Sequence, residues 1–154
     1  MPRVLAAALT GAALAWVILL LAAPLAPRES VLVYALAGEV CHQRADRSFH
    51  LAGAPLPVCA RCFALYASGA AAAAIAWLLG RWNATAPGAR AARLLFAAAA
   101  APTVVTVALE RLGLAAPSNL ARALSALPLG AVAGWLFVRA LLAEARGEPV
   151  RYHA

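Results

Sequence analysis

Residues 58–80 read VCARCFALYASGAAAAAIAWLLG, an apolar run in which Arg61 is the single charged residue. A helix needs about 20 apolar residues to cross the hydrocarbon core of a bilayer. Pro57 stands directly before the run, and proline is favoured in the first turn of a helix. The stretch therefore predicts a membrane-spanning helix that begins beside a pair of cysteines.

Three further apolar runs of similar length lie at about residues 4–26, 94–110 and 120–142. Between the first two runs lie a short apolar stretch at 31–40 and a polar segment at 41–57. We predict an all-α fold: an integral membrane four-helix bundle with a short interfacial helix at 31–40 and a Cys/His-containing loop at 41–57. We expect residues 1–154 to form a single transmembrane domain.

The composition excludes the common soluble classes. Hydrophobic residues make up 65% of the chain and charged residues 12%, with a mean hydropathy of +0.82, whereas soluble domains are ~45–50% apolar and ~25% charged. All 13 basic residues are arginines and the net charge is +7. The arginines stand mostly at the ends of apolar runs, without a basic stripe interleaved with aromatics, so we expect a lipid bilayer rather than nucleic acid as the partner.

The orientation in the membrane is only weakly encoded. Four spans place both termini on one side, and the arginines divide almost equally between the two sides. When Arg44, Arg47 and Arg61 are set aside as part of a folded site, the remaining arginines favour cytoplasmic termini in a multi-pass plasma membrane protein. The sequence identifies no protein partner and leaves association into a homo-oligomer open.

Small residues recur on two of the expected spans, as they do where membrane helices approach closely. On the fourth span they are Ala126, Gly130 and Gly134. On the second span they recur at every fourth position, at 60, 64, 68, 72, 76 and 80. These stripes predict the faces through which the spans pack.

The chain has three cysteines, and each has a chemically informative neighbour. Cys41 precedes His42, and Cys59 and Cys62 form a C-x-x-C pair at the start of a span. That position places both thiols on one helix face, where the helix dipole favours the thiolate. Three thiolates and one imidazole are a common ligand set for zinc, so we predict that Cys41, His42, Cys59 and Cys62 bind zinc or another divalent metal, with His50 as an alternative fourth ligand.

Two other interpretations remain open at this stage. The Cys59/Cys62 pair has the spacing of a thiol–disulfide oxidoreductase, in which Cys41 would act as a relay and a quinone or a partner protein would exchange the electrons. The three residues are also compatible with buried thiols that behave as small hydrophobes in a non-catalytic membrane scaffold subunit. The spacing alone does not decide whether the protein is an enzyme.

Four charged residues are candidates for supporting roles: Asp46, Arg47, Arg61 and Glu110. The simpler interpretation of the polar segment is a charged loop whose ions pair with one another. The alternative is that Arg47 and Arg61 bind an anionic group or lower the pKa of the thiols. Glu110 ends the third span, and acidic residues at such a depth usually mark a functional site or an internal ion pair.

Residues 41–62, CHQRADRSFHLAGAPLPVCARC, resemble the signature of the domain of unknown function 2085 family of small integral membrane proteins. The later stretch LERLGLAAPSNLARALSALPLGAVAG, at 109–134, resembles the second half of that family. Ala64 stands where the family usually has glycine, and Thr106 where an aspartate is expected. The resemblance implies a membrane protein but no particular activity.

Overall fold

The computed structural model describes residues 1–26, 28–80 and 87–145. The arginines of 81–86 and 146–154, which enter the orientation prediction, lie outside the described residues. Along the chain the elements are α1 (Pro2–Ala22), η1 (Ala23–Leu25), α2 (Val31–Gly38), η2 (Ala45–Arg47), β1 (His50–Leu51), β2 (Ala54–Pro55), α3 (Ala60–Gly80), α4 (Ala89–Arg111) and α5 (Asn119–Glu144).

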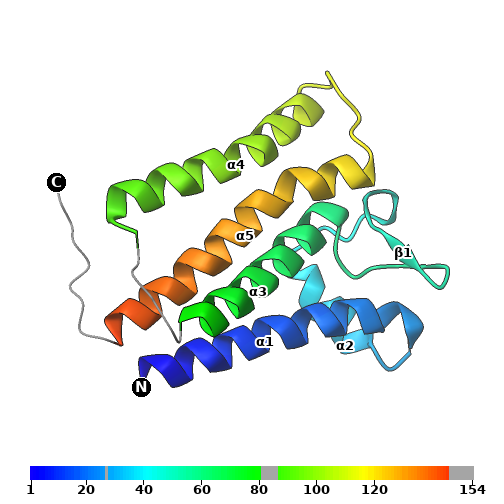
Figure 1. The fold of residues 1–154 in the computed structure, drawn as a ribbon. Coiled ribbons are helices and arrows are strands. Elements are labelled where there is room, and N and C mark those ends of the chain that lie inside the picture. The colour runs from blue at the N-terminus through cyan, green and yellow to red at the C-terminus, as the bar shows by residue number, and fades with distance from the viewer. Residues whose placement is uncertain (27, 81–86, 146–154) are drawn as a thin grey trace.

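Four helices are long and apolar enough to cross a membrane, which confirms the predicted all-α fold (Figure 1). They contain 24, 21, 23 and 26 residues when η1 is counted with α1, which corresponds to roughly 30–40 Å at the rise of an α-helix. The short helix α2 lies within the predicted range 31–40. Helix α4 begins at Ala89 rather than near residue 94, because the alanines and arginines after Gly88 favour helix over a linker.

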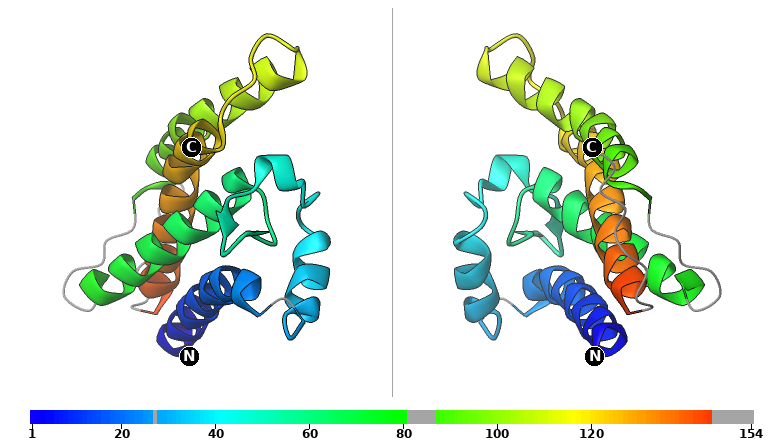
Figure 2. Two further views of the ribbon diagram at one scale, coloured as in Figure 1. Left: turned by 90° about the vertical axis from the view of Figure 1, so that its right-hand side faces the viewer. Right: turned by 90° about the vertical axis from the view of Figure 1, so that its left-hand side faces the viewer.

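Helices α3 and α5 form the centre of the molecule and pack along their length. Helix α1 contacts both of them, whereas α4 packs mainly on α5, at the outer edge (Figures 1 and 2). Helix α2 and the polar segment lie at the end of the bundle where α1 stops and α3 begins. The fold therefore gathers the cysteines and most of the polar loop residues at one end of the spans.

Glycines allow α3 and α5 to approach backbone to backbone. A Cβ atom on Gly130 would overlap the carbonyl oxygen of Leu65 and the hydroxyl of Ser68, and one on Gly134 would overlap the carbonyl oxygen of Gly69. Because lipid supplies little hydrophobic drive between helices, such close contact is a main source of their association. The small-residue face predicted for the fourth span therefore packs against α3.

We expect Gly134→Leu to destabilise the protein strongly, since the new side chain would have to displace the Gly69 backbone. Overpacking of this kind costs about 1–3 kcal/mol or more. Gly11→Leu on α1 is the matched control, because no described atom outside the backbone of its own helix turns lies within 4 Å of a Cβ built there. Thermal unfolding in detergent measures both variants, and an equal loss of stability in the two would contradict the proposed contact.

The stripe on α3 is more complex than the sequence predicted. Positions 60, 64, 76 and 80 are buried, whereas 68 and 72 are half-buried and Ala70 and Ala73 are buried outside the stripe. The reason is that α3 buries two faces. Ala60 and Ala64 pack with alanines of α5, and Ala73 belongs to a second cluster that includes Ala6 of α1. The i+4 stripe contributes to both contacts, since Ala76 lies in the cluster with Ala6, but it omits Ala73 of the same cluster.

Hydroxyl groups join α4 to α5. The Thr103 hydroxyl donates a hydrogen bond to the Ser125 carbonyl oxygen at 2.7 Å, and the Thr106 hydroxyl lies 3.1 Å from Ser125 Oγ. Hydrogen bonds of this kind across membrane helices contribute about 1 kcal/mol. Thr106 thus contributes to helix packing at the position where the family resemblance leads us to expect an aspartate.

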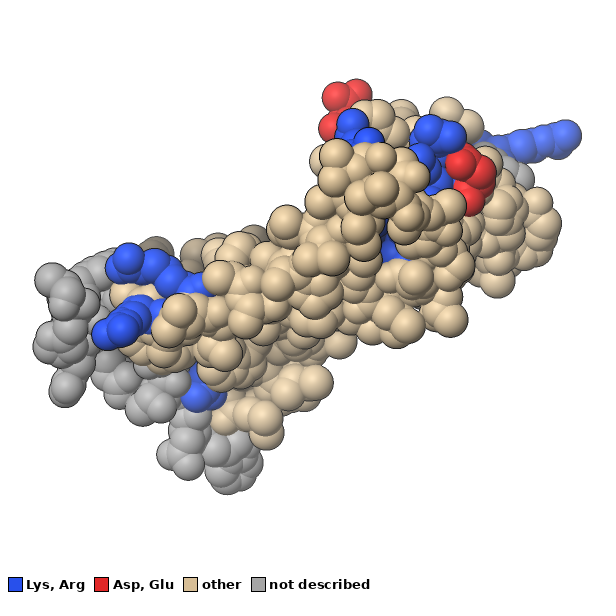
Figure 3. All heavy atoms as spheres, turned by 90° about the horizontal axis from the view of Figure 1, so that it is seen from above, with Lys and Arg blue, Asp and Glu red and all other residues tan. Residues whose placement is uncertain are grey.

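Charged side chains gather at the two ends of the long helices, with a broad uncharged surface between them (Figure 3). Large apolar side chains of three of the long helices, such as Ile18, Ile75 and Val104, are more than half exposed. Water would oppose this exposure, whereas hydrocarbon favours it. The distribution of charge is that of a protein in contact with a lipid bilayer.

Candidate functional site

The polar segment has a defined structure rather than a single extended loop. After η2, the strands β1 and β2 pair antiparallel, with Leu51 opposite Ala54. The turn residues Ala52 and Gly53 have φ values of 51° and 82°, as in the two-residue turns whose twist matches that of a hairpin. This hairpin could not be predicted from the sequence, because two residues per strand are too few to show an alternating pattern.

Gln43 holds α2 against the residues that lead into α3. Its side-chain Nε2 donates hydrogen bonds to the carbonyl oxygens of Tyr34 at 2.6 Å and Pro57 at 2.9 Å. The Tyr34 hydroxyl donates to the Pro55 carbonyl oxygen at 2.8 Å. These bonds join two segments that flank the cysteines, so they set where Cys41 lies relative to Cys59.

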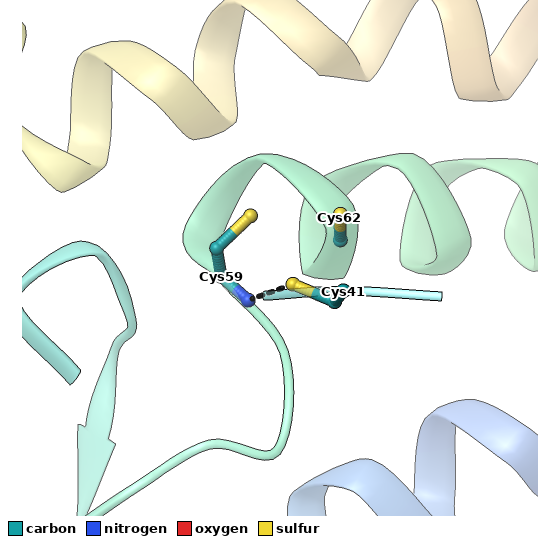
Figure 4. A group of neighbouring side chains, drawn as sticks. All are labelled: Cys41, Cys59 and Cys62. Atoms are coloured by element: carbon teal, nitrogen blue, oxygen red, sulfur yellow. Dashed lines mark hydrogen bonds between the residues drawn. The ribbon is translucent and has the colours of Figure 1, made fainter. Parts of the chain in front are cut away.

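The three cysteines converge at this junction (Figure 4). Their Sγ atoms lie within 4.8 Å of one another. The Cys59 backbone N–H donates a hydrogen bond to Cys41 Sγ at 3.2 Å. The Cys59 carbonyl oxygen accepts a hydrogen bond from the Phe63 N–H at 2.9 Å, and this bond lies at the start of α3. Cys41 is 7% exposed and packs among apolar side chains, while Cys59 and Cys62 are half-buried. The fold therefore brings together residues that stand 18 and 21 positions apart.

Cys59 has the character of a thiolate. A hydrogen bond from the Cys62 thiol, with a second from the Cys62 backbone N–H, lowers the pKa of Cys59 from 9.0 to about 5, against the effect of burial. The lowered pKa favours the thiolate form of Cys59 at neutral pH. A thiolate is both the metal-binding and the nucleophilic form of cysteine, so this property suits either chemistry.

His42 and His50, the two histidines proposed as ligands, are exposed, and neither belongs to the group of three residues that the structure brings together. His42 lines a cavity that Cys59 also lines, whereas His50 lies in the hairpin. Asp46 is exposed as well and pairs with Arg44 at 3.2 Å, and the hydrogen bond from Arg44 lowers the pKa of Asp46. The structure thus brings three of the four predicted metal ligands together, and the fourth stays a prediction.

Glu110 is the centre of an ion-pair cluster. Its carboxylate lies 3.0 Å from Arg47 of the polar segment, 3.4 Å from Arg61 of α3 and 2.9 Å from Arg122 of α5. The Glu110 side chain is 11% exposed, and so is that of Arg122. One carboxylate at the end of α4 therefore connects four parts of the chain.

Asn119 extends this cluster to the backbone of the polar segment. Its Nδ2 donates a hydrogen bond to the Ser48 carbonyl oxygen at 3.0 Å, and its Oδ1 accepts one from Arg122 at 2.9 Å. Ser48 is 1% exposed, and its hydroxyl donates to the Arg44 carbonyl oxygen at 3.0 Å. Asn119 and Arg122 lie within the second stretch that resembles the family, but nothing local in the sequence shows that they reach the segment at 41–57.

Residues 41–136 match the sequence model of a protein family, DUF2085, whose description is predicted membrane protein. The chain belongs to the DUF2085 family. The matched region begins at Cys41 and ends inside α5, so it contains the cysteines and the Glu110 cluster, while α1 precedes it. Neither the curated proteins nor the solved structures gave a match.

Proposed function

We propose that this DUF2085 protein binds a divalent metal, with zinc the best fit, at the membrane surface. The observation that carries the proposal is the approach of Cys41, Cys59 and Cys62, whose Sγ atoms lie within 4.8 Å of one another. Thiolates on one tetrahedral zinc ion stand about 3.8 Å apart, given Zn–S bonds of about 2.3 Å. The separation of the three sulfur atoms is therefore close to that expected in such a site.

We assign the fourth position to His42, which follows Cys41 and lines a cavity with Cys59. His42 is exposed, and its side chain would turn toward the cysteines to complete the ligand set. Three thiolates, a neutral imidazole and a divalent ion carry a net charge of −1. The excess of arginines around the adjacent cavity, Arg61 among them, compensates that charge.

The metal would join the end of α2 to the start of α3, and so organise the polar end of a single transmembrane domain. We further propose that the protein lies in the plasma membrane with cytoplasmic termini. The cysteines then face the opposite side, where thiols that are not bound to a metal are open to oxidation. Metal ligation would protect them there.

Metal analysis of detergent-purified protein, combined with thiol counting, tests the proposal. We expect about one metal per chain, slow alkylation of the three thiols, and faster alkylation once a chelator is added. His42→Ala should lower metal affinity, whereas His50→Ala, an exposed histidine in the hairpin, should not. Purified protein without metal but with a Cys59–Cys62 disulfide would overturn the proposal and favour a redox function.

The second candidate, a thiol–disulfide oxidoreductase, is favoured by the low pKa of Cys59. The first cysteine of a C-x-x-C pair is the attacking nucleophile in such proteins. Oxidation of the Cys59 and Cys62 thiols to a disulfide releases two electrons and two protons, which convert a quinone to a quinol. Cys41, whose Sγ lies near both, is placed to pass the disulfide onward.

Alkylation as a function of pH tests the state of Cys59 in chelator-treated protein. Because the pKa is lowered to about 5, the reactive thiolate should persist as the pH falls from 9 and be lost only near pH 5. Cys62→Ala removes the donor, so the midpoint should move up toward 9.0, the ordinary value. Peptide mass spectrometry after iodoacetamide treatment resolves the site, and a midpoint near 9 in both proteins contradicts the assignment.

A further inference from the structure

A polar cavity of about 520 Å³ lies beside the cysteine cluster, between the polar segment and the ends of α3, α4 and α5. Its volume is within the range of small-molecule sites, about 300–1,000 Å³. Glu110 is the one acidic residue that lines it in the described part of the chain, and five arginines line it with Glu110: Arg44, Arg47, Arg61, Arg111 and Arg122.

The cavity has a large excess of positive charge. Five arginines against one carboxylate give its lining a formal charge of +4, or +3 when Cys59, which also lines the cavity, is a thiolate. Asp46, which pairs with Arg44 and Arg47 outside the lining, is an exposed side chain and offsets only one of these charges. In partly buried surroundings such a field is weakly screened and attracts anions.

The arginines that surround Glu110 also have too few acceptors. Each guanidinium carries five N–H donors, and a carboxylate offers about four lone-pair sites. The Nε atoms of Arg47, Arg61 and Arg122 are buried and have no hydrogen-bond partner among the described residues. An oxyanion in the cavity would add acceptors to this cluster, with the guanidinium groups turning to share them.

The position of the cavity relative to the membrane indicates which class of anion it would bind. Arg61 is the second residue of α3, Arg111 is the last of α4, and Arg122 lies in the first turn of α5. All three therefore stand where spans end, at the level of lipid headgroups. Phosphate groups occur at this level, and arginine binds phosphate through paired N–H donors.

We propose that this cavity binds a phosphate group, carried either by a soluble molecule or by the headgroup of an anionic lipid. The arginines would bind the phosphate, while His42 and Cys59 of the proposed metal site line the same cavity. Phosphate binding does not require the metal, and it can be measured after the metal has been removed. It gives a function to the positive charge of the lining that remains after Glu110 and the proposed metal site have been balanced.

Binding of inorganic phosphate to chelator-treated, detergent-purified protein tests the first source. Arg111→Gln is the informative variant, because Arg111 lines the cavity but takes no part in the Glu110 ion pairs. Loss of one charged donor should weaken binding about tenfold. Arg44→Gln is a second exposed variant, and Arg28→Gln, an exposed arginine at the same end but outside the cavity, should leave binding unchanged.

Reconstitution into vesicles of phosphatidylcholine and phosphatidylglycerol tests the second source, through the lipids that remain bound after detergent extraction. Saturable phosphate binding that weakens in Arg111→Gln supports a soluble ligand. Enrichment of phosphatidylglycerol that is lost in Arg111→Gln, without binding of free phosphate, supports a lipid headgroup. If neither arm distinguishes Arg111→Gln and Arg44→Gln from Arg28→Gln, the cavity is not a phosphate site.

Discussion

Serine in place of any one of Cys41, Cys59 and Cys62 is expected to lower metal affinity by at least about a hundredfold. Structural zinc sites bind with about 10–16 kcal/mol, which is roughly 3 kcal/mol for each of four ligands. The three variants should lose stability alike, because an incomplete set of ligands leaves the remaining thiols partly buried without their metal. Competition with a chelator of known affinity and thermal unfolding measure the two effects.

Equal losses of metal affinity and stability in the three variants would distinguish a metal site from a redox site. In a redox site the variants would differ, since loss of the attacking cysteine abolishes exchange, while loss of its resolving partner traps a mixed disulfide. Val58→Ala is the control for packing, because Val58 is 0% exposed in the cluster that contains Cys41 but offers no ligand. It should lower stability and leave metal binding intact. Three variants that keep their metal would exclude the site.

The fold was predictable because a membrane span needs little beyond length and apolarity. The four runs became four helices, with α4 starting at Ala89 as the main departure. What the sequence did not predict was how α3 divides its faces between two neighbours. That division depends on where α1 lies, which the small residues of α3 do not specify.

The candidate site was predictable only in part, for a related reason. The C-x-x-C pair and Cys41 are visible as local motifs, and the structure joins them. Gln43 and Asn119, in contrast, act through backbone carbonyls that lie 9, 14 and 71 residues away. A single polar side chain that bonds to a distant carbonyl leaves no periodic signal, so such bonds appear only once the helices are placed.

Glu110→Gln is expected to destabilise the protein by about 3 kcal/mol, because removing one partner from a largely buried ion pair leaves uncompensated charge. The substitution keeps the shape of the side chain but leaves Arg47, Arg61 and Arg122 facing a neutral amide. Their mutual repulsion should loosen the polar segment from α4 and α5. The apparent Tm in detergent should fall by roughly 5–10 °C, whereas Glu39→Gln, an exposed acid outside these ion pairs, should change it little.

A double variant separates repulsion from simple loss of contacts. Arg122 is the partner at 2.9 Å and is as buried as Glu110, so Arg122→Gln alone should also destabilise the protein. In the double variant Glu110→Gln/Arg122→Gln one unpaired charge is removed, and the loss of stability should be smaller than the sum of the two single losses. Strict additivity would mean that the two side chains contribute independently, and the Glu110 cluster would then not act as a unit that holds the four segments together.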